Sequence, residues 1–260
     1  MILPRLVHQA GSLPGIGALL RRTSYIYREG SVVTIPFGKG AGAKWRRHHR
    51  YVSGYWLGIY EPKMQTALSR LVCENDVVYD VGANAGFFTL LAARLAGNRG
   101  RVFAFEPLFE NAESIREQVE VNNLGNCEVV RAAVSDVPGS APFTITENNS
   151  MGRMAGTDEQ GELTVETISI DSFAGANQRP NVIKIDVEGA EVKVLEGAAL
   201  TLSSAPAPKL LIELHGHEVA TQVASFLSGI GFSLFDLDFA PITSGVGQAH
   251  HVVALPPERK

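Results

Sequence analysis

The sequence is poor in cysteine and has no long apolar run. Two cysteines in 260 residues, Cys73 and Cys127, are too few for a disulfide framework or a cysteine-based zinc site, and they fit a reducing compartment. No stretch of about 18 apolar residues occurs, so we expect no membrane span. The N-terminus does not have the pattern of a signal peptide, because Pro4 and Pro14 interrupt it. We therefore expect a cytoplasmic protein.

The composition is that of a globular chain, with 45% hydrophobic and 19% charged residues, which excludes disorder as the main state. The net charge of −4 hides an uneven distribution. Residues 1–50 hold nine arginines and lysines against the single acid Glu29, or +8, and the other 210 residues hold 14 basic and 26 acidic residues, or −12. Both tryptophans and five of the six tyrosines lie within residues 1–60. This basic, aromatic-rich N-terminal segment either binds an anionic or sugar-like partner or forms ion pairs with the acidic remainder of the chain.

Strand and helix patterns alternate from residue 61 onward, which predicts an α/β fold with a doubly wound, mostly parallel sheet. The patterns predict strands at 77–81, 101–105, 128–134, 182–186, 210–215, 232–237 and 251–255, and helices at 61–71, 87–96, 111–122, 190–202 and 218–227. Residues 141–146 and 163–170 alternate like exposed strands around a polar loop, which indicates a β-insertion. We place an N-terminal extension at 1–54, with an arm, a short helix and a strand at 31–35, and the main domain at 55–260.

The first motif that carries chemistry is Asp80-Val81-Gly82-Ala83-Asn84-Ala85-Gly86, where a strand turns into a helix. Glycine lets a backbone approach a ligand closely, and the start of a helix offers free N–H groups. Glu106 follows Gly86 by 20 residues, at the end of the next strand, where an acid can bind the hydroxyls of a ribose. The pattern predicts a site for a nucleoside-containing cofactor.

The spacing favours S-adenosylmethionine over NAD. The motif reads G-x-x-x-G instead of the dinucleotide fingerprint G-x-G-x-x-G. Asp80 precedes the first glycine, and its carboxylate would repel a pyrophosphate but attract a sulfonium and an α-amine. The alternative is that this strand, turn and helix bind no cofactor and that Asp80 is there by chance.

The second motif contains Lys184, Asp186 and Glu188. Lys184 and Asp186 are two residues apart on a strand and share a face. A lysine within a buried strand needs a partner, which Asp80 or Glu213 can supply, so Lys184 is either functional or part of a structural ion pair. Asp186 ends its strand beside the expected cofactor site, which favours a functional role.

Glu213 and His215 form a third motif at the end of the following strand. Together with Asp186 or Glu188 they would place acids and an imidazole in one cleft. His215 is a candidate general base, a candidate ligand of a divalent ion with Asp186 and Glu213, or a structural histidine. We expect His250 and His251, at the start of the last strand, to be surface residues.

The chain contains, in this order and over roughly residues 55–235, the segments VYDVGANAGFFTLLAARLAG, GRVFAFEP, AVSD, TISIDSF, NVIKIDVEGAEVKVLEGA and LLIELHG. In these segments it resembles the FkbM family of S-adenosylmethionine-dependent methyltransferases. It implies a seven-stranded Rossmann-like methyltransferase fold whose last strand, 251–255, is antiparallel. It does not imply a metal, although a divalent ion is compatible with the family.

The resemblance also implies a cofactor-binding set. Asp80, Gly82, Asn84 and Gly86 would line the methionine end, Glu106 and the adjoining Pro107 would lie at the ribose, Ser135 and Asp136 would lie near the adenine, and Glu61 would close the site. The same resemblance suggests O-methylation of a sugar, a glycan or another natural product with a hydroxyl group.

Such a hydroxyl needs a base that takes its proton, and His215 or Asp186 is the candidate, within a catalytic set completed by Glu188 and Lys184. Tyrosines and tryptophans of the N-terminal head, Trp45 among them, either stack on the acceptor or pack the extension onto the domain. The alternatives are methylation of RNA or of an amine, an NAD-dependent oxidoreductase, and a non-catalytic protein that binds S-adenosylmethionine. Binding to nucleic acid is the less favoured expectation, and the sequence fixes neither the acceptor nor the oligomeric state.

Overall fold

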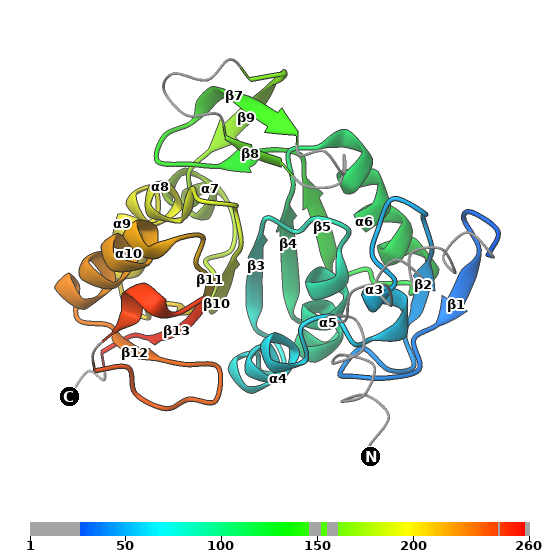
Figure 1. Ribbon diagram of the computed structural model, residues 1–260, viewed down its shortest axis with the longest axis horizontal. Helices are drawn as coiled ribbons and strands as arrows, with labels where there is room; N and C mark the ends of the chain where they lie inside the picture. The colour runs from blue at the N-terminus through cyan, green and yellow to red at the C-terminus, as the bar shows by residue number, and fades with distance from the viewer. Residues whose placement is uncertain (1–26, 146–151, 155–160, 244, 258–260) are drawn as a thin grey trace.

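The computed structural model describes residues 27–145, 152–154, 161–243 and 245–257 (Figure 1). Its main sheet has seven strands in the order β12-β13-β11-β10-β3-β4-β5. From β3 onward in the chain they are β3 Val77–Val81, β4 Arg101–Phe105, β5 Cys127–Val130, β10 Val182–Ile185, β11 Lys209–Glu213, β12 Ser233–Phe235 and β13 His251–Leu255. The expected N-terminal arm and short helix, up to residue 26, lie outside the described residues.

Only β13 runs against its neighbours in this sheet. It pairs antiparallel with both β11 and β12, and the pairs β11-β10, β10-β3, β3-β4 and β4-β5 are parallel. The predicted doubly wound sheet and its antiparallel last strand are therefore confirmed. Because β13 is reversed, its first residue His251 lies opposite the last residue of β11, Glu213, at the edge where the parallel strands end.

Each face of the sheet is covered by its own set of helices. Alternate residues of β3 show this division, because Val78 packs in one hydrophobic cluster and Tyr79 in the other. The Val78 face is covered by α4 Pro62–Leu71, α5 Phe87–Ala96 and α6 Phe109–Val121. The Tyr79 face is covered by α7 Ile170–Ala176, α8 Glu191–Glu196, α9 Ala199–Ser203 and α10 His217–Gly229. Both faces are lined mainly by apolar side chains, as is typical of parallel strands buried on two faces, although β3 and β10 also bury Asp80 and Lys184.

The N-terminal extension packs onto the Val78 side of the molecule. It contains a two-stranded hairpin, β1 Val32–Thr34 and β2 Lys44–Arg46, and the short helix α3 Gly54–Leu57 begins where the extension ends. Trp45 is 1% exposed, and its ring contacts those of Tyr55 and Phe87. Gln118 of α6 bonds the backbone of Arg46 in both directions, at 2.8 and 3.0 Å. The strand at 31–35 is confirmed, and Trp45 packs the extension against the domain.

The predicted strand at 128–134 is wrong as one unit. The chain turns after β5, where the Ala132 amide donates to the Val130 carbonyl, and the next residues form a separate strand, β6 Ala133–Val134. This strand belongs to a second sheet in the order β6-β9-β7-β8, with β7 Gly139–Ile145, β8 Gly152–Met154 and β9 Leu163–Ile168. The described part of the predicted β-insertion therefore forms a small sheet at one end of the main one (Figure 1).

The predicted helix at 190–202 is also wrong as one unit, because it is divided into α8 and α9 at Gly197. The Gly197 carbonyl accepts the Asp171 amide at 2.8 Å instead of continuing a helical bond. The Asp171 carboxylate then accepts the amides of Leu200 and Thr201 and so caps α9. The sequence did not predict α7, the helix that carries Asp171.

Candidate active site

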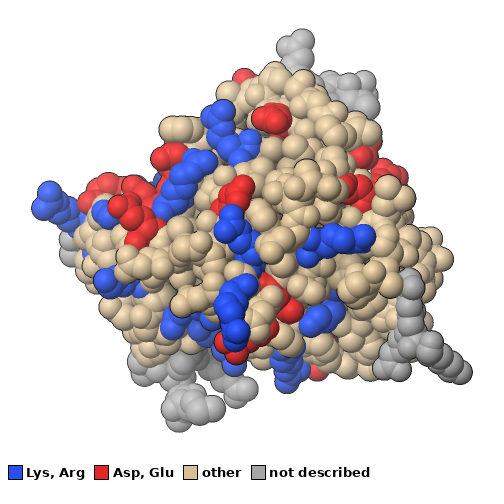
Figure 2. All heavy atoms as spheres, turned by 180° about the vertical axis from the view of Figure 1, so that it is seen from behind, with Lys and Arg blue, Asp and Glu red and all other residues tan. Residues whose placement is uncertain are grey.

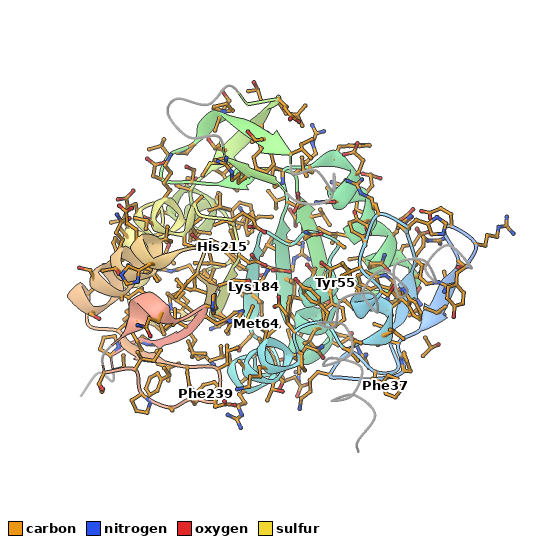
Figure 3. All side chains as sticks on the ribbon, viewed as in Figure 1. Phe37, Tyr55, Met64, Lys184, His215 and Phe239 are labelled. Atoms are coloured by element: carbon orange, nitrogen blue, oxygen red, sulfur yellow. The ribbon has the colours of Figure 1, made fainter. Side chains whose placement is uncertain are left out.

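A cavity of about 320 Å³ opens at the carboxyl ends of the parallel strands. Eight of the predicted site residues line it: Glu61, Gly82, Asn84, Glu106, Pro107, Lys184, Asp186 and Glu188. Its walls also include Tyr51 from the extension, Tyr55 from α3, and Phe143 and Met154 from the small sheet. The extension, the ends of the parallel strands and the small sheet therefore enclose one space. Figure 3 places Tyr55, Lys184 and His215 around the centre of the molecule.

The loop after β3 is shaped by contacts within the protein. Gly82 has φ +74°, and a Cβ there would lie 1.8 Å from the carbonyl oxygen of Asp186. Gly86, with φ +90°, precedes α5, and a Cβ there would lie 3.1 Å from Ile115. Gly82 is required because the loop touches the end of β10, which differs from the close approach to a ligand that the motif suggested. Gly82 lines the cavity, whereas Asp80 and Gly86 do not.

Glu106 is buried at the end of β4 and is held by two backbone amides. Its Oε2 accepts the Asn84 amide and its Oε1 accepts the Leu108 amide, each at 2.9 Å. Burial raises the pKa of Glu106 to about 7, against the lowering effect of these two bonds. The carboxyl group is therefore fixed in orientation, lines the cavity and titrates near neutrality.

Lys184 is buried within β10 and joins two aspartates. Its Nζ lies 3.4 Å from Asp80 Oδ1 and 3.3 Å from Asp186 Oδ2, and it donates to the Gly82 carbonyl at 3.1 Å. Burial alone would lower the pKa of Lys184, but Asp186 and Asp80 outweigh burial and raise it, so the amine is a cation. Asp80 accepts a further bond from Thr89 at 2.6 Å. The expected buried partner is thus Asp80, together with Asp186 instead of Glu213.

His215 lies among four carboxylates. Its Nδ1 is 2.7 Å from Glu191 Oε1, and its Nε2 is 3.4 Å from Glu188 and 3.9 Å from Asp186. The fourth, Glu213, is 3.8 Å from Nε2. The hydrogen bond to Glu191 raises the pKa of His215 to about 9 in spite of partial burial, so the ring is protonated at neutral pH.

Glu191 is a residue of the site to which sequence reasoning assigned no role. It is fully buried at the start of α8, and it accepts the Gly189 amide as well as His215. Its signal in the sequence is its position in KIDVEGAE, three residues after Glu188. Glu188 itself has φ +54°, a left-handed conformation that is unusual for a residue with a side chain, and burial raises the pKa of its carboxyl group.

His251 is half-buried beside Glu213, so the expectation that it lies on the surface is wrong. The reversed direction of β13 brings it to the edge of the cavity. Ser135 and Asp136 do not line the cavity in the described structure. Ser135 is buried and donates to the exposed Asp136 at 2.8 Å, while the preceding residues 132–134 form part of the wall.

The sheet order and the acidic edge at its carboxyl ends define a Rossmann-like methyltransferase fold. The chain belongs to the FkbM methyltransferase family, whose domain model matches residues 80–234. The domain uses S-adenosylmethionine as its cofactor, as the sequence predicted.

Two curated proteins and one solved structure illustrate what the chain is similar to. It is 31% identical to the hexuronic acid methyltransferase AglP of Haloferax volcanii over 60% of this chain and 62% of that protein. It is 26% identical to methyltransferase 1 of Beauveria bassiana over 48% of this chain and 59% of that protein. The chain thus spans about three fifths of each relative. A SAM-dependent O-methyltransferase from Thermotoga maritima aligns with a TM-score of 0.48 and 14% identity, over 77% of this chain and 67% of that one.

Among the described residues, no helix combines the length and the apolar character needed to cross a membrane.

Proposed function

We propose that this chain transfers a methyl group from S-adenosylmethionine to a hydroxyl group of a sugar or glycan. The observation that carries the proposal is the position of Asp186, which lines the same cavity as the predicted cofactor loop and lies between two cations, Lys184 and His215. The hexuronic acid methyltransferase that the chain resembles supports a sugar acceptor.

The lining of the cavity fits S-adenosylmethionine. Each Glu106 oxygen accepts one backbone amide and has acceptor capacity left for a ribose hydroxyl. Glu61 adds a carboxylate that suits the positive charge of the methionine part. When bound, the cofactor supplies a methyl group on a sulfonium, which is a good electrophile. The protein therefore needs only to orient the acceptor and to take its proton.

We assign the proton acceptor to Asp186. Of the two candidates it lines the cavity, whereas His215 does not and has its Nδ1 bonded to Glu191. Lys184 and His215 hold Asp186 from two sides, and this fixes the carboxylate that faces the acceptor hydroxyl. Tyr51 and Tyr55 supply aromatic wall on which a sugar can stack.

The extension does not favour the alternative acceptor, RNA. Arg47 is 8% exposed and stacks on Tyr27 at 3.8 Å, and Arg46 donates to the Gly30 carbonyl. Basic side chains on the face shown in Figure 2 are interspersed with acidic ones. Both observations fit arginines that hold the extension in place.

Turnover with a panel of hexuronic acids and neutral hexoses, read as S-adenosylhomocysteine release, tests the proposal. We expect Asp186→Asn to lose at least a hundredfold in kcat while it binds S-adenosylhomocysteine within threefold of the parent. His215→Gln should lose less, because it removes a support of Asp186. Full turnover in Asp186→Asn, or methylation restricted to amines or RNA, would refute the proposal.

A further inference from the structure

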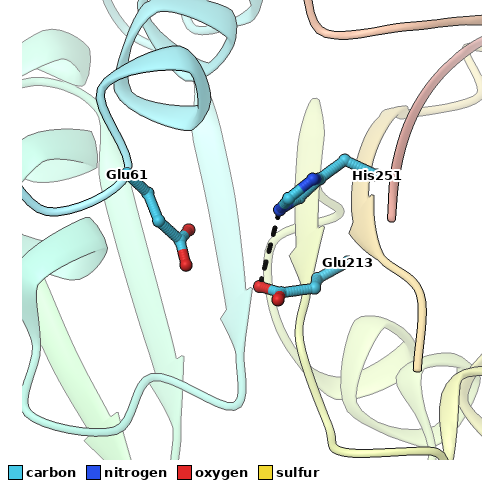
Figure 4. Close-up of side chains that lie close together, drawn as sticks. All are labelled: Glu61, Glu213 and His251. Atoms are coloured by element: carbon cyan, nitrogen blue, oxygen red, sulfur yellow. Dashed lines mark ion pairs between the residues drawn. The ribbon is translucent and has the colours of Figure 1, made fainter. Parts of the chain in front are cut away.

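Three potential metal ligands from distant parts of the chain meet beside the cavity. Glu61 precedes α4, Glu213 ends β11 and His251 begins β13, and one ligand atom from each lies within 4.8 Å of the other two (Figure 4). Glu213 and His251 are register partners in the sheet, so backbone pairing fixes their relative position. Glu61 has φ +41°, so its backbone is left-handed. The chain turns there, and the Glu61 side chain lies beside Glu213 and His251.

The side-chain atoms that meet there can accept hydrogen bonds, but few hydrogen-bond donors face them. Glu61 Oε2 and His251 Nε2 are both enclosed, and neither has a hydrogen-bond partner among the described residues. The nearest acidic oxygen to His251 Nε2 is Glu213 Oε2 at 3.8 Å, which is too long for a hydrogen bond. An enclosed polar atom without a partner is costly, and a bound ion would satisfy both atoms at once.

The basic side chains nearby contact other acids as well. Lys184 lies between Asp80 and Asp186, and His215 is bonded through Nδ1 to Glu191 while its Nε2 lies 3.8 Å from Glu213. Two carboxyl groups and one imidazole therefore meet here beside cations that they share with other acids.

We propose that Glu61, Glu213 and His251 bind one divalent transition-metal ion. One imidazole with two carboxylates is a mixed nitrogen and oxygen donor set, which suits Mn²⁺ or Zn²⁺. Glu213 and Glu61 both line the cavity, so the ion would lie at its wall, within reach of an acceptor hydroxyl. Such an ion could polarise that hydroxyl, and this role rests on the proposed function. The metal site itself rests on the geometry alone.

A second group, Asp186, Glu188 and His215, has similar spacing but less need of an ion. None of its side-chain oxygen or nitrogen atoms is enclosed without a hydrogen-bond partner among the described residues, unlike Glu61 Oε2 and His251 Nε2. Asp186 also has the cation Lys184 at 3.3 Å. The Glu61 group is therefore the site that we assign.

The test is calorimetric titration of the chelator-treated 260-residue chain with Mn²⁺ and with Zn²⁺, without cofactor or acceptor. We expect one ion per chain for at least one of the two metals, and affinity at least tenfold weaker in His251→Ala and in Glu61→Gln. His48→Ala is the matched control, because His48 is similarly buried and also contacts two glutamates, Glu29 and Glu117, but does not line the cavity. It should bind the ion like the parent protein.

Absence of binding by the parent protein up to 1 mM of either metal would overturn the proposal, and this reading does not depend on whether a variant folds. Binding that survives in His251→Ala but is lost in His215→Ala would overturn it too, in favour of the other group. The titration needs neither cofactor nor acceptor, so a negative result in the separate turnover assay would count against the proposed function and leave the metal site intact.

Discussion

The Nδ1 atom of His215 lies 2.7 Å from the carboxylate of Glu191, a residue with no exposed surface. A buried acid that holds a histidine which in turn faces Asp186 is a positioning arrangement, since Glu191 itself does not line the cavity. The order of the three side chains predicts how each should respond to replacement.

Replacement of Glu191 separates orientation from charge. We expect Glu191→Leu to lower kcat at least tenfold with little change in the KM for cofactor, because His215 loses its anchor. Glu191→Gln should recover most of that loss, since its amide oxygen still accepts the Nδ1 proton. In metal-free protein, NMR titration should give a His215 pKa near 9 in the parent and a value closer to 6.5 in Glu191→Gln. Equal kcat in the Leu and Gln variants would contradict a positioning role.

Binding of S-adenosylhomocysteine should depend on pH through Glu106. Its ionised form is the stronger acceptor for ribose hydroxyls, so affinity should increase as pH rises through about 7 and then level off. Glu106→Gln should remove this dependence and weaken binding at pH 8 by roughly 10- to 100-fold, the equivalent of about 1.5–3 kcal/mol for a charged hydrogen bond. Calorimetry from pH 6 to 8 measures both effects. Glu110→Gln, an exposed neighbour, is the control and should follow the parent.

The same group affects stability in the opposite sense. Folded Glu106 keeps its proton up to about pH 7, whereas an unfolded glutamate loses it near 4.5. The folded state therefore binds more protons in this window, and the unliganded protein should lose stability as pH rises from about 4.5 to 7. The fall in urea midpoint across this window should be smaller in Glu106→Gln. An unchanged fall would show that other groups cause it.

Trp45 should be the residue of the extension on which stability depends most. Its replacement by Ala should cost about 3–5 kcal/mol, because a large ring enclosed by Tyr55 and Phe87 leaves a cavity behind. Both neighbours line the site, so cofactor affinity should fall as well. Urea unfolding and calorimetry measure the two effects, and Trp45→Phe should retain more of each. A loss below 1 kcal/mol in Trp45→Ala would argue against this packing.

Removal of the buried cation should be costly. Lys184→Met leaves Asp80 and Asp186 without their shared partner, and the loss should be about 3–5 kcal/mol in the free energy of unfolding. Asp80→Asn in the Lys184→Met background should recover about 1–3 kcal/mol, because it removes one of the uncompensated charges. Additive losses in the double variant would mean that the two residues do not interact.

The main sheet was predictable because its strands are buried on both faces and bounded by turn residues. The ranges 77–81, 101–105 and 251–255 match β3, β4 and β13, and 87–96 matches α5. The errors at 128–134 and 190–202 have a common cause. In both segments a backbone hydrogen bond interrupts the regular element. The Ala132 amide bonds the Val130 carbonyl in the first, and the Asp171 amide bonds the Gly197 carbonyl in the second. A local sequence pattern does not contain this information.

The site was predictable where a residue ends a parallel strand. Glu106, Asp186 and Glu213 follow this rule, and all three line the cavity. Glu191 was missed because it lies inside a helix, and His251 because it begins a strand. The antiparallel pairing of β13 with β11 is what brings His251 to the edge of the sheet where the parallel strands end.

The approach between Gly82 and the Asp186 carbonyl leaves no room for a methyl group at residue 82. The loop after β3 and the loop after β10 are therefore in contact at this point. Any side chain at residue 82 would have to displace the end of β10, so a substitution of Gly82 would disturb Asp186 and the cavity wall that it forms as well as the loop after β3.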